Sequence, residues 1–118
     1  MTLKIKMKQA DGKVSDVIFS ANAATPIRFK HVFHKDFWKI LGGIDEINHG
    51  EILEQLDTIG ELAFIMHCQG ENRDMNAITY DDYVAWLETL DGMAILSNAK
   101  TILSLYIAQN QSASVPKK

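Results

Sequence analysis

The sequence contains a single cysteine, two prolines and no long hydrophobic run. One cysteine excludes an internal disulfide, so we expect a reducing compartment. No apolar stretch approaches the roughly 18 residues that a membrane-spanning helix needs, so we expect no membrane segment. Lys4, Lys6 and Lys8 interrupt the first apolar residues, which argues against a signal peptide. The remaining composition, 47% hydrophobic and 23% charged over 118 residues, predicts one globular domain with its own core.

Charge is distributed unevenly along the chain. Residues 1–42 carry eight Lys or Arg and three Asp or Glu, a net charge of +5. Residues 43–99 carry one Arg and twelve Asp or Glu, a net charge of −11. The basic part can face the acidic part of the same chain or of a second copy, and such complementarity sets orientation and encounter rate more than affinity.

The first twenty residues predict a β-hairpin. In "LKIKMK" apolar and lysine residues alternate, as in a strand with one buried face and a lysine-bearing outer face. Asp11-Gly12 is a turn signal, because glycine accepts the positive φ of a tight turn. "KVSDVIFS" then predicts the return strand, with a register that its weaker alternation leaves open.

Helices are predicted for most of the rest of the chain. Thr25-Pro26 indicates the start of the first, with the threonine as cap, and Gly42-Gly43 its end. Its apolar side is formed by Phe29, Phe33, Phe37, Ile40 and Leu41. A long second helix is predicted from about Asp45 or Glu51 to Gln69, ended by Gly70.

The second half of that long helix lacks a polar face. No charged residue occurs from Leu62 to Cys68, whereas the first half has an acidic face. A helix end of this kind is either buried on all sides or part of an interface. The sequence leaves both possibilities open.

Two more helices are predicted after the polar loop "GENRDMNA". Thr79 and Asp82 resemble a capping box. A helical stripe follows and is closed by Gly92; it consists of Tyr83, Val84, Leu87 and Leu90. A last helix is predicted from about Met93 to Gln109. The expected fold is therefore α+β: an N-terminal β-hairpin followed by about four helices, in one domain (1–109) with a flexible C-terminal tail (110–118).

The residues that most often carry chemistry do not form a recognisable site in the sequence. His31 and His34 share a helix side, but spacing supplies no third zinc ligand. His67 and Cys68 are adjacent, so on a helix they point about 100° apart and form no direct thiolate–imidazole pair. We therefore expect no catalytic residue, no metal site and no cofactor, and a buried, structural Cys68.

Two other groups of residues have open interpretations. Trp38 and Trp86 lie off the apolar stripes, so each is either an interface anchor or the cover of a core edge. The lysines of the first strand and first helix form a modest basic patch. Because the sequence pI is about 5.7, we favour a solvated or partner-facing surface over nucleic-acid binding.

The order of segments resembles the tail assembly chaperones of long-tailed bacteriophages, especially those of Gram-positive hosts. The resembling segments are "PIRFKHVFHKDFWKILGG", "QLDTIGELAFIMHCQGE" and "ITYDDYVAWLETLDG". The family pattern Leu-Asp-x-x-x-Glu-Leu-Ala-x-Ile-Met is matched by Leu56, Asp57, Glu61, Leu62, Ala63, Ile65 and Met66. A later Trp-Leu-Glu is matched by Trp86, Leu87 and Glu88. The resemblance spans about residues 1–108.

This resemblance implies a protein that is not an enzyme. Such chaperones coat the tape measure protein in the host cytoplasm before tail tube subunits polymerise, and they are absent from the mature virion. Self-association is implied, and a longer frameshifted form often accompanies the short one. The alternative is a generic protein-interaction or phage adaptor domain without a chaperone role. The side chains that we expect to contact a partner are Lys35, Trp38, Lys39, Leu62, Ile65 and Trp86.

Overall fold

The computed structural model describes residues 2–35 and 56–114, with side chains described as far as Ile107. Its elements are β1 (Thr2–Lys8), β2 (Val14–Ser20), α1 (Thr25–Phe33), α4 (Leu56–Gly70), a 3-10 turn (Met75–Ala77), α5 (Tyr80–Leu87) and α6 (Ala94–Ser114). The predicted α+β fold, an N-terminal hairpin followed by helices, is confirmed. The predictions for Phe37, Ile40, Leu41 and Gly42-Gly43, and for the start of the long helix, lie outside the described residues.

The hairpin has the predicted turn and one buried face. Gly12 has φ 88° and donates its N–H to Gln9 O at 2.9 Å. The strands pair antiparallel with Ile5 opposite Val17, which resolves the register that the sequence left open. Ile5 and Val17 lie on the core face, together with Met7 and Phe19. Leu3 was also predicted on the buried face, but it is 40% exposed because it lies near the open end of the hairpin.

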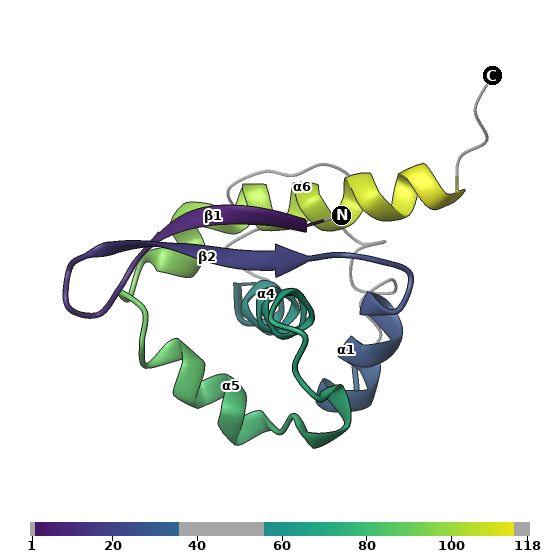
Figure 1. Ribbon diagram of the computed structural model, residues 1–118, viewed down its shortest axis with the longest axis horizontal. Helices are drawn as coiled ribbons and strands as arrows, with labels where there is room; N and C mark the ends of the chain where they lie inside the picture. The colour runs from purple at the N-terminus through teal and green to yellow at the C-terminus, as the bar shows by residue number, and fades with distance from the viewer. Residues whose placement is uncertain (1, 36–55, 115–118) are drawn as a thin grey trace.

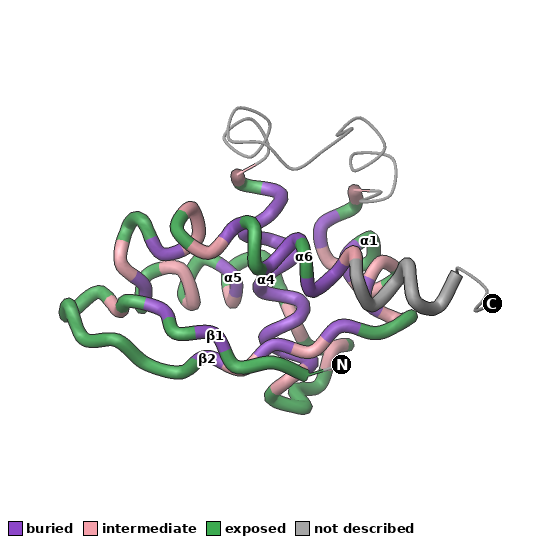
Figure 2. The backbone as a smooth tube through the Cα atoms, turned by 90° about the horizontal axis from the view of Figure 1, so that it is seen from above, coloured by how far each residue is buried: buried purple, intermediate pink, exposed green. Residues whose placement is uncertain are grey.

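Helix α4 is the centre of the molecule. Figure 1 shows it end-on, below the hairpin and between α1 and α5, while α6 runs along the upper side of the hairpin. Every residue from Thr58 to Gln69 is buried, and Figure 2 shows the same buried colour along the helix. The charge-free segment Leu62–Cys68 is therefore buried on all sides, which decides between the two possibilities left by the sequence.

Helix α1 begins close to the predicted residue but differs at both ends. Its N-cap is Ala24, without a side-chain cap, so the predicted capping role of Thr25 was wrong. The Thr25 hydroxyl oxygen instead accepts from Asn22 N (3.0 Å) and from Gln69 Nε2 (2.9 Å). The helix ends at Phe33, because His34 adopts a left-handed conformation (φ 59°) that closes the last turn.

The two C-terminal helices largely follow the sequence. The capping box of Thr79 and Asp82 is confirmed at the start of α5. Leu90, predicted on the α5 stripe, lies beyond the helix and pairs with Gln9 in an isolated β-bridge. Helix α6 continues to Ser114, past the predicted end at Gln109, because residues 110–114 contain neither glycine nor proline.

Candidate functional site

The partner-contacting residues predicted on the central helix are inaccessible. Leu62 and Ile65 are both 0% exposed, because α4 is packed from every direction. Neither side chain can reach a partner while the chain is folded as described. Trp38 and Lys39 lie outside the described residues.

Trp86 covers an edge of the core. Its indole stacks on the His67 ring, with a centroid distance of 5.2 Å and an interplanar angle of 20°. It also contacts Phe64 at 5.6 Å and Phe19 at 6.4 Å. The side chain is partly buried against the hydrophobic core. Of the two interpretations of this tryptophan, the geometry favours the core edge.

His67 joins the central helix to the hairpin. Its Nδ1 lies 2.8 Å from Ile18 O, so this nitrogen carries the hydrogen and donates it. Its Nε2 lies 3.3 Å from a carboxylate oxygen of Glu71. Both ring nitrogens of His67 are therefore engaged in structural contacts, and neither faces Cys68.

Cys68 is a buried thiol. Its side chain is 0% exposed, and this burial raises its pKa to about 11, although the nearby Arg73 guanidinium opposes the shift. Arg73 Nη1 lies 3.7 Å from the sulfur. A thiol with a raised pKa is a poor nucleophile at neutral pH. These observations agree with a structural cysteine.

The structure offers no support for a metal centre among the residues that it describes. His31 and His34 are both exposed. Within the described ranges, no three His, Cys, Asp or Glu side chains are close enough to hold an ion together. The same ranges contain no helix of the length and apolar character that crossing a membrane requires.

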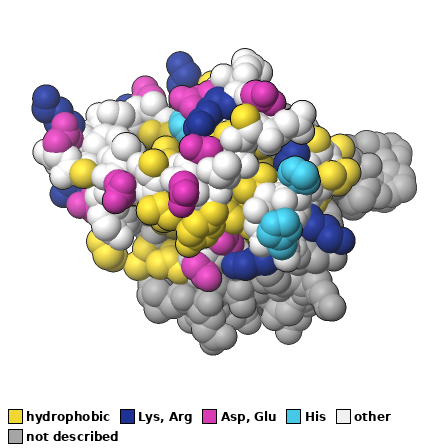
Figure 3. Space-filling view, turned by 90° about the horizontal axis from the view of Figure 1, so that it is seen from below, with side chains coloured by type: hydrophobic (Ala, Val, Ile, Leu, Met, Phe, Trp, Pro, Cys, Tyr) yellow, Lys and Arg dark blue, Asp and Glu magenta, His cyan; other side chains and the backbone are white. Residues whose placement is uncertain are grey.

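A cleft between α4, α5 and the start of α6 is the strongest candidate for a binding site. It has a volume of about 610 Å³, and we call it the α4–α5 cleft. Its lining residues are Leu56, Asp57, Gly60, Glu61, Tyr80, Tyr83, Leu87, Gly92 and Ile95. Figure 3 shows this side of the molecule, where hydrophobic side chains gather between acidic ones. The cleft thus combines an apolar lining with negative charge.

Polar contacts at one end of the cleft hold its acidic residues in place. Lys35 Nζ lies 2.8 Å from Glu61 Oε1 and 3.9 Å from Asp57 Oδ2. The hydrogen bond with Glu61 raises the pKa of Lys35, so the ammonium stays charged at neutral pH. Tyr83 donates a long hydrogen bond (3.4 Å) to Asp57 O, and its burial raises the pKa of the phenol. Lys35, which was predicted to contact a partner, therefore lies beside this cleft.

Helix α5 extends the negative surface around the cleft. It begins with Asp81 and Asp82 and is followed by Glu88, with no basic residue between them. Tyr80 is 57% exposed and Val84 is 37% exposed on the same helix. Sequence reasoning missed Tyr80 as a site residue. The available signal was an aromatic residue in the first turn of an acidic helix.

Comparisons of this chain with protein-family models, with curated proteins and with solved structures give no match. The cleft and the charge distribution are therefore the basis for a functional proposal, together with the resemblance in segment order.

Proposed function

We propose that this protein is a tail assembly chaperone of a long-tailed bacteriophage or prophage. In this role it binds the tape measure protein and keeps it soluble in the bacterial host cytoplasm until tail tube subunits polymerise. The observation that carries the proposal is the α4–α5 cleft, with its apolar lining and acidic side chains. The order of segments that resembles this family supports it independently.

The chemistry of the cleft suits a helical client. A tape measure protein is a long helical chain with apolar stripes, and a groove binds the apolar face of such a helix by burying it. Asp57, whose side chain is 77% exposed, then favours clients with Lys or Arg beside the apolar stripe, whereas the buried Glu61 is already paired with Lys35. Many weak sites along one client add up through avidity, so no single cleft needs high affinity.

Self-association completes this proposal. The basic residues 1–42 and the acidic residues 43–99 have complementary charge. Neighbouring copies on a client can therefore meet through different surfaces, a contact that repeats into rings or spirals. A longer frameshifted form is expected to join the same assembly, and neither form is expected in the mature virion.

The proposed role is a binding role without catalysis. His67 and Cys68, the residues that a small enzyme would use, are engaged in packing and hydrogen bonds inside the domain. The second candidate function, a generic interaction or phage adaptor domain, uses the same cleft. It differs in having no effect on tape measure solubility.

Co-expression tests the chaperone proposal. With the native protein, we expect the cognate tape measure protein to remain in the soluble fraction, and with Tyr80→Ala we expect it to precipitate. Tyr80 lines the cleft and is 57% exposed, so its truncation removes contact area. Because its ring also packs against Phe33 and Tyr83, at centroid distances of 6.3 and 5.7 Å, circular dichroism should establish that the variant is folded. Val84→Ala is the matched control, because Val84 is exposed on the same helix but does not line the cleft.

Two results would contradict the proposal. Precipitation of the tape measure protein beside native, folded protein would reject the chaperone role and leave the adaptor alternative. Equal solubilisation by Tyr80→Ala and by the native protein would reject the cleft as the binding site.

A further inference from the structure

The two edges of the hairpin differ in how their backbone groups are satisfied. At the outer edge of β2, the carbonyl oxygens of Ile18 and Ser20 accept hydrogen bonds from His67 Nδ1 (2.8 Å) and Gln69 Nε2 (2.7 Å). Side chains of α4 thus cover that edge. A covered edge is protected from pairing with another strand.

Within the described residues, the outer edge of β1 is paired only at its C-terminal end. There Asp91 N donates to Lys8 O at 2.9 Å, and Ala10 N donates to Thr89 O at 3.0 Å. The N–H and C=O of alternate residues point to the same side of an antiparallel strand. Lys4 and Lys6 therefore direct their backbone groups to the same edge as Lys8.

At Lys4 and Lys6 this edge has no hydrogen-bond partner within the part of the chain that the structure describes, although α6 packs against β1. No described residue forms a hydrogen bond with the backbone groups that these two lysines direct outward. Residues 89–91 pair with the end of this edge through an isolated β-bridge and two backbone hydrogen bonds. An added strand would continue the same ladder along β1.

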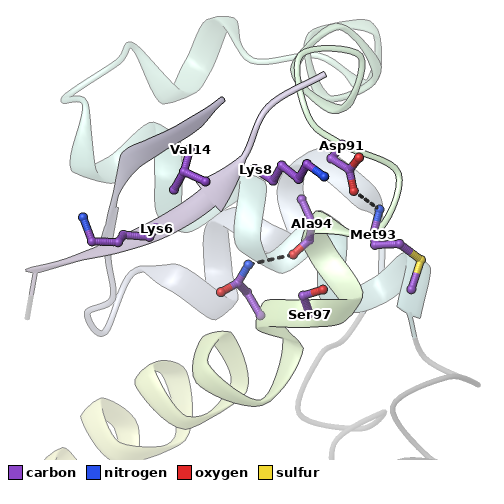
Figure 4. A pocket seen from close by; sticks show the side chains of 8 residues that line it. Lys6, Lys8, Val14, Asp91, Met93, Ala94 and Ser97 are labelled. Atoms are coloured by element: carbon purple, nitrogen blue, oxygen red, sulfur yellow. Dashed lines mark hydrogen bonds between the residues drawn. The ribbon is translucent and has the colours of Figure 1, made fainter. Parts of the chain in front are cut away.

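Charge on the outer face of the hairpin selects the kind of strand that fits. Lys4, Lys6 and Lys8 lie on this face. Among the described residues, the one carboxylate that forms an ion pair with them is that of Asp16, 3.2 Å from Lys6 in an exposed pair of little energetic weight. A hollow of about 470 Å³ lies beside Lys6 and Lys8. Figure 4 shows the two lysines projecting from β1, with the first turn of α6 on the other side of the hollow.

We propose that the β1 edge at Lys4 and Lys6 binds an extended segment of another protein as an added strand, with acidic side chains at alternate positions of that segment. Main-chain hydrogen bonds supply the binding, and the acidic side chains face the lysines across the strand pair. This surface is separate from the α4–α5 cleft, so it does not depend on the tape measure proposal.

Other occupants fit this edge less well. A second copy paired through its own β1 would place lysines opposite lysines, which is destabilising. A DNA backbone offers phosphate acceptors but no donors for the outward C=O groups of Lys4 and Lys6. An acidic peptide strand satisfies both the donors and the acceptors.

Amide hydrogen exchange followed by NMR tests the proposal on the full chain. The probe is a capped peptide that alternates glutamate and valine, and the control is the corresponding lysine–valine peptide. In the free protein we expect the Lys4 and Lys6 amides to exchange rapidly and the Leu3 and Ile5 amides to be protected by the ladder. With saturating acidic peptide, exchange at Lys4 and Lys6 should slow at least about tenfold.

Two proline variants separate the backbone contact from a general effect on the hairpin. Lys4→Pro removes an N–H that faces the free edge and leaves the ladder with β2 intact, so binding of the acidic peptide should be lost. Asp16→Pro is the matched control, because Asp16 directs its N–H to the opposite edge of the hairpin. Binding to this control should persist or strengthen, because Asp16→Pro also removes the carboxylate paired with Lys6. Circular dichroism establishes that both variants are folded.

Lys4→Gln isolates the charge. This variant keeps the backbone donor, so it should still bind, with a lower affinity and a weaker salt dependence than the native protein. The proposal is overturned if the Lys4 and Lys6 amides are already protected in the free protein. It is also overturned if folded Lys4→Pro binds the acidic peptide as the native protein does, or if the lysine–valine peptide binds equally well.

Discussion

Replacing Gly60 with alanine tests how closely α5 is pressed against α4. A Cβ atom at position 60 would lie 2.6 Å from the hydroxyl oxygen of Tyr83 but 3.7 Å from its ring carbon Cζ. The hydroxyl oxygen is therefore the atom in conflict. Alanine is about 1 kcal/mol better than glycine inside a helix. Overpacking a buried contact costs about 1–3 kcal/mol, so Gly60→Ala should lower the free energy of unfolding by up to about 2 kcal/mol.

The sign of this effect should reverse when the oxygen is removed. Tyr83→Phe loses one long hydrogen bond, to Asp57 O at 3.4 Å, and should cost less than about 1 kcal/mol. In the Tyr83→Phe background, Gly60→Ala should then raise stability by about 1 kcal/mol through helix propensity alone.

Urea unfolding of the native protein, both single variants and the double variant provides the cycle. Tryptophan fluorescence and circular dichroism should give coincident transitions, and the coupling free energy should be about 1–3 kcal/mol. If Gly60→Ala stabilises both backgrounds equally, α5 is not pressed against α4 at this point, and the inferred cleft geometry is refuted.

Three buried polar groups lead to further measurable outcomes. Burial raises the pKa of Cys68 from 9.0 to about 11, so the unfolded chain loses this proton first and stability should fall by about 2 kcal/mol as pH rises from 9 to 11. Urea titrations across this range should show a smaller fall in Cys68→Ala, and an unchanged slope would argue against the buried thiol. Gln69 donates to Ser20 O and accepts from Arg28 Nη1, so Gln69→Ala should cost about 2–3 kcal/mol in thermal unfolding, and a cost below about 0.5 kcal/mol would exclude this hub. Lys35→Ala leaves the buried Glu61 carboxylate without its ammonium partner. Because the lysine is partly exposed and its charge is screened by solvent, we expect the free energy of unfolding to fall by about 1–2 kcal/mol, which is more than for Lys35→Arg. The pKa of Lys35 is raised in the fold, so the stability that its charge contributes should be complete below pH 10.5 and should disappear at higher pH. The measurement is a comparison of native protein with Lys35→Ala in strong alkali, where the two should be equally stable.

Local patterns in the sequence were sufficient for several elements. Lysine alternation with Asp11-Gly12 predicts the hairpin, because turn geometry and the two-residue period of a strand act over a few residues. The same holds for the Thr79 and Asp82 capping box, whose two hydrogen bonds both form within one helical turn. The end of α4 at Gly70 is also a local signal.

Contacts between distant residues account for what the sequence could not predict. Thr25 was expected to cap a helix. Instead, its hydroxyl oxygen accepts a hydrogen bond from Gln69 Nε2, a residue 44 positions later in the chain. The close approach of Tyr83 to Gly60 and the pairing of Asp91 with Lys8 likewise depend on how the helices pack. None of these contacts leaves a periodic signature in the chain.

The sequence by itself determined that residues 62–68 form a helix segment without a polar side. Only the tertiary structure decided that this segment is the core rather than a binding surface, and that the accessible apolar lining instead belongs to Tyr80 and Leu87 beside acidic residues. The physical reason is that hydrophobicity is a property of each side chain, whereas burial depends on which other elements surround it.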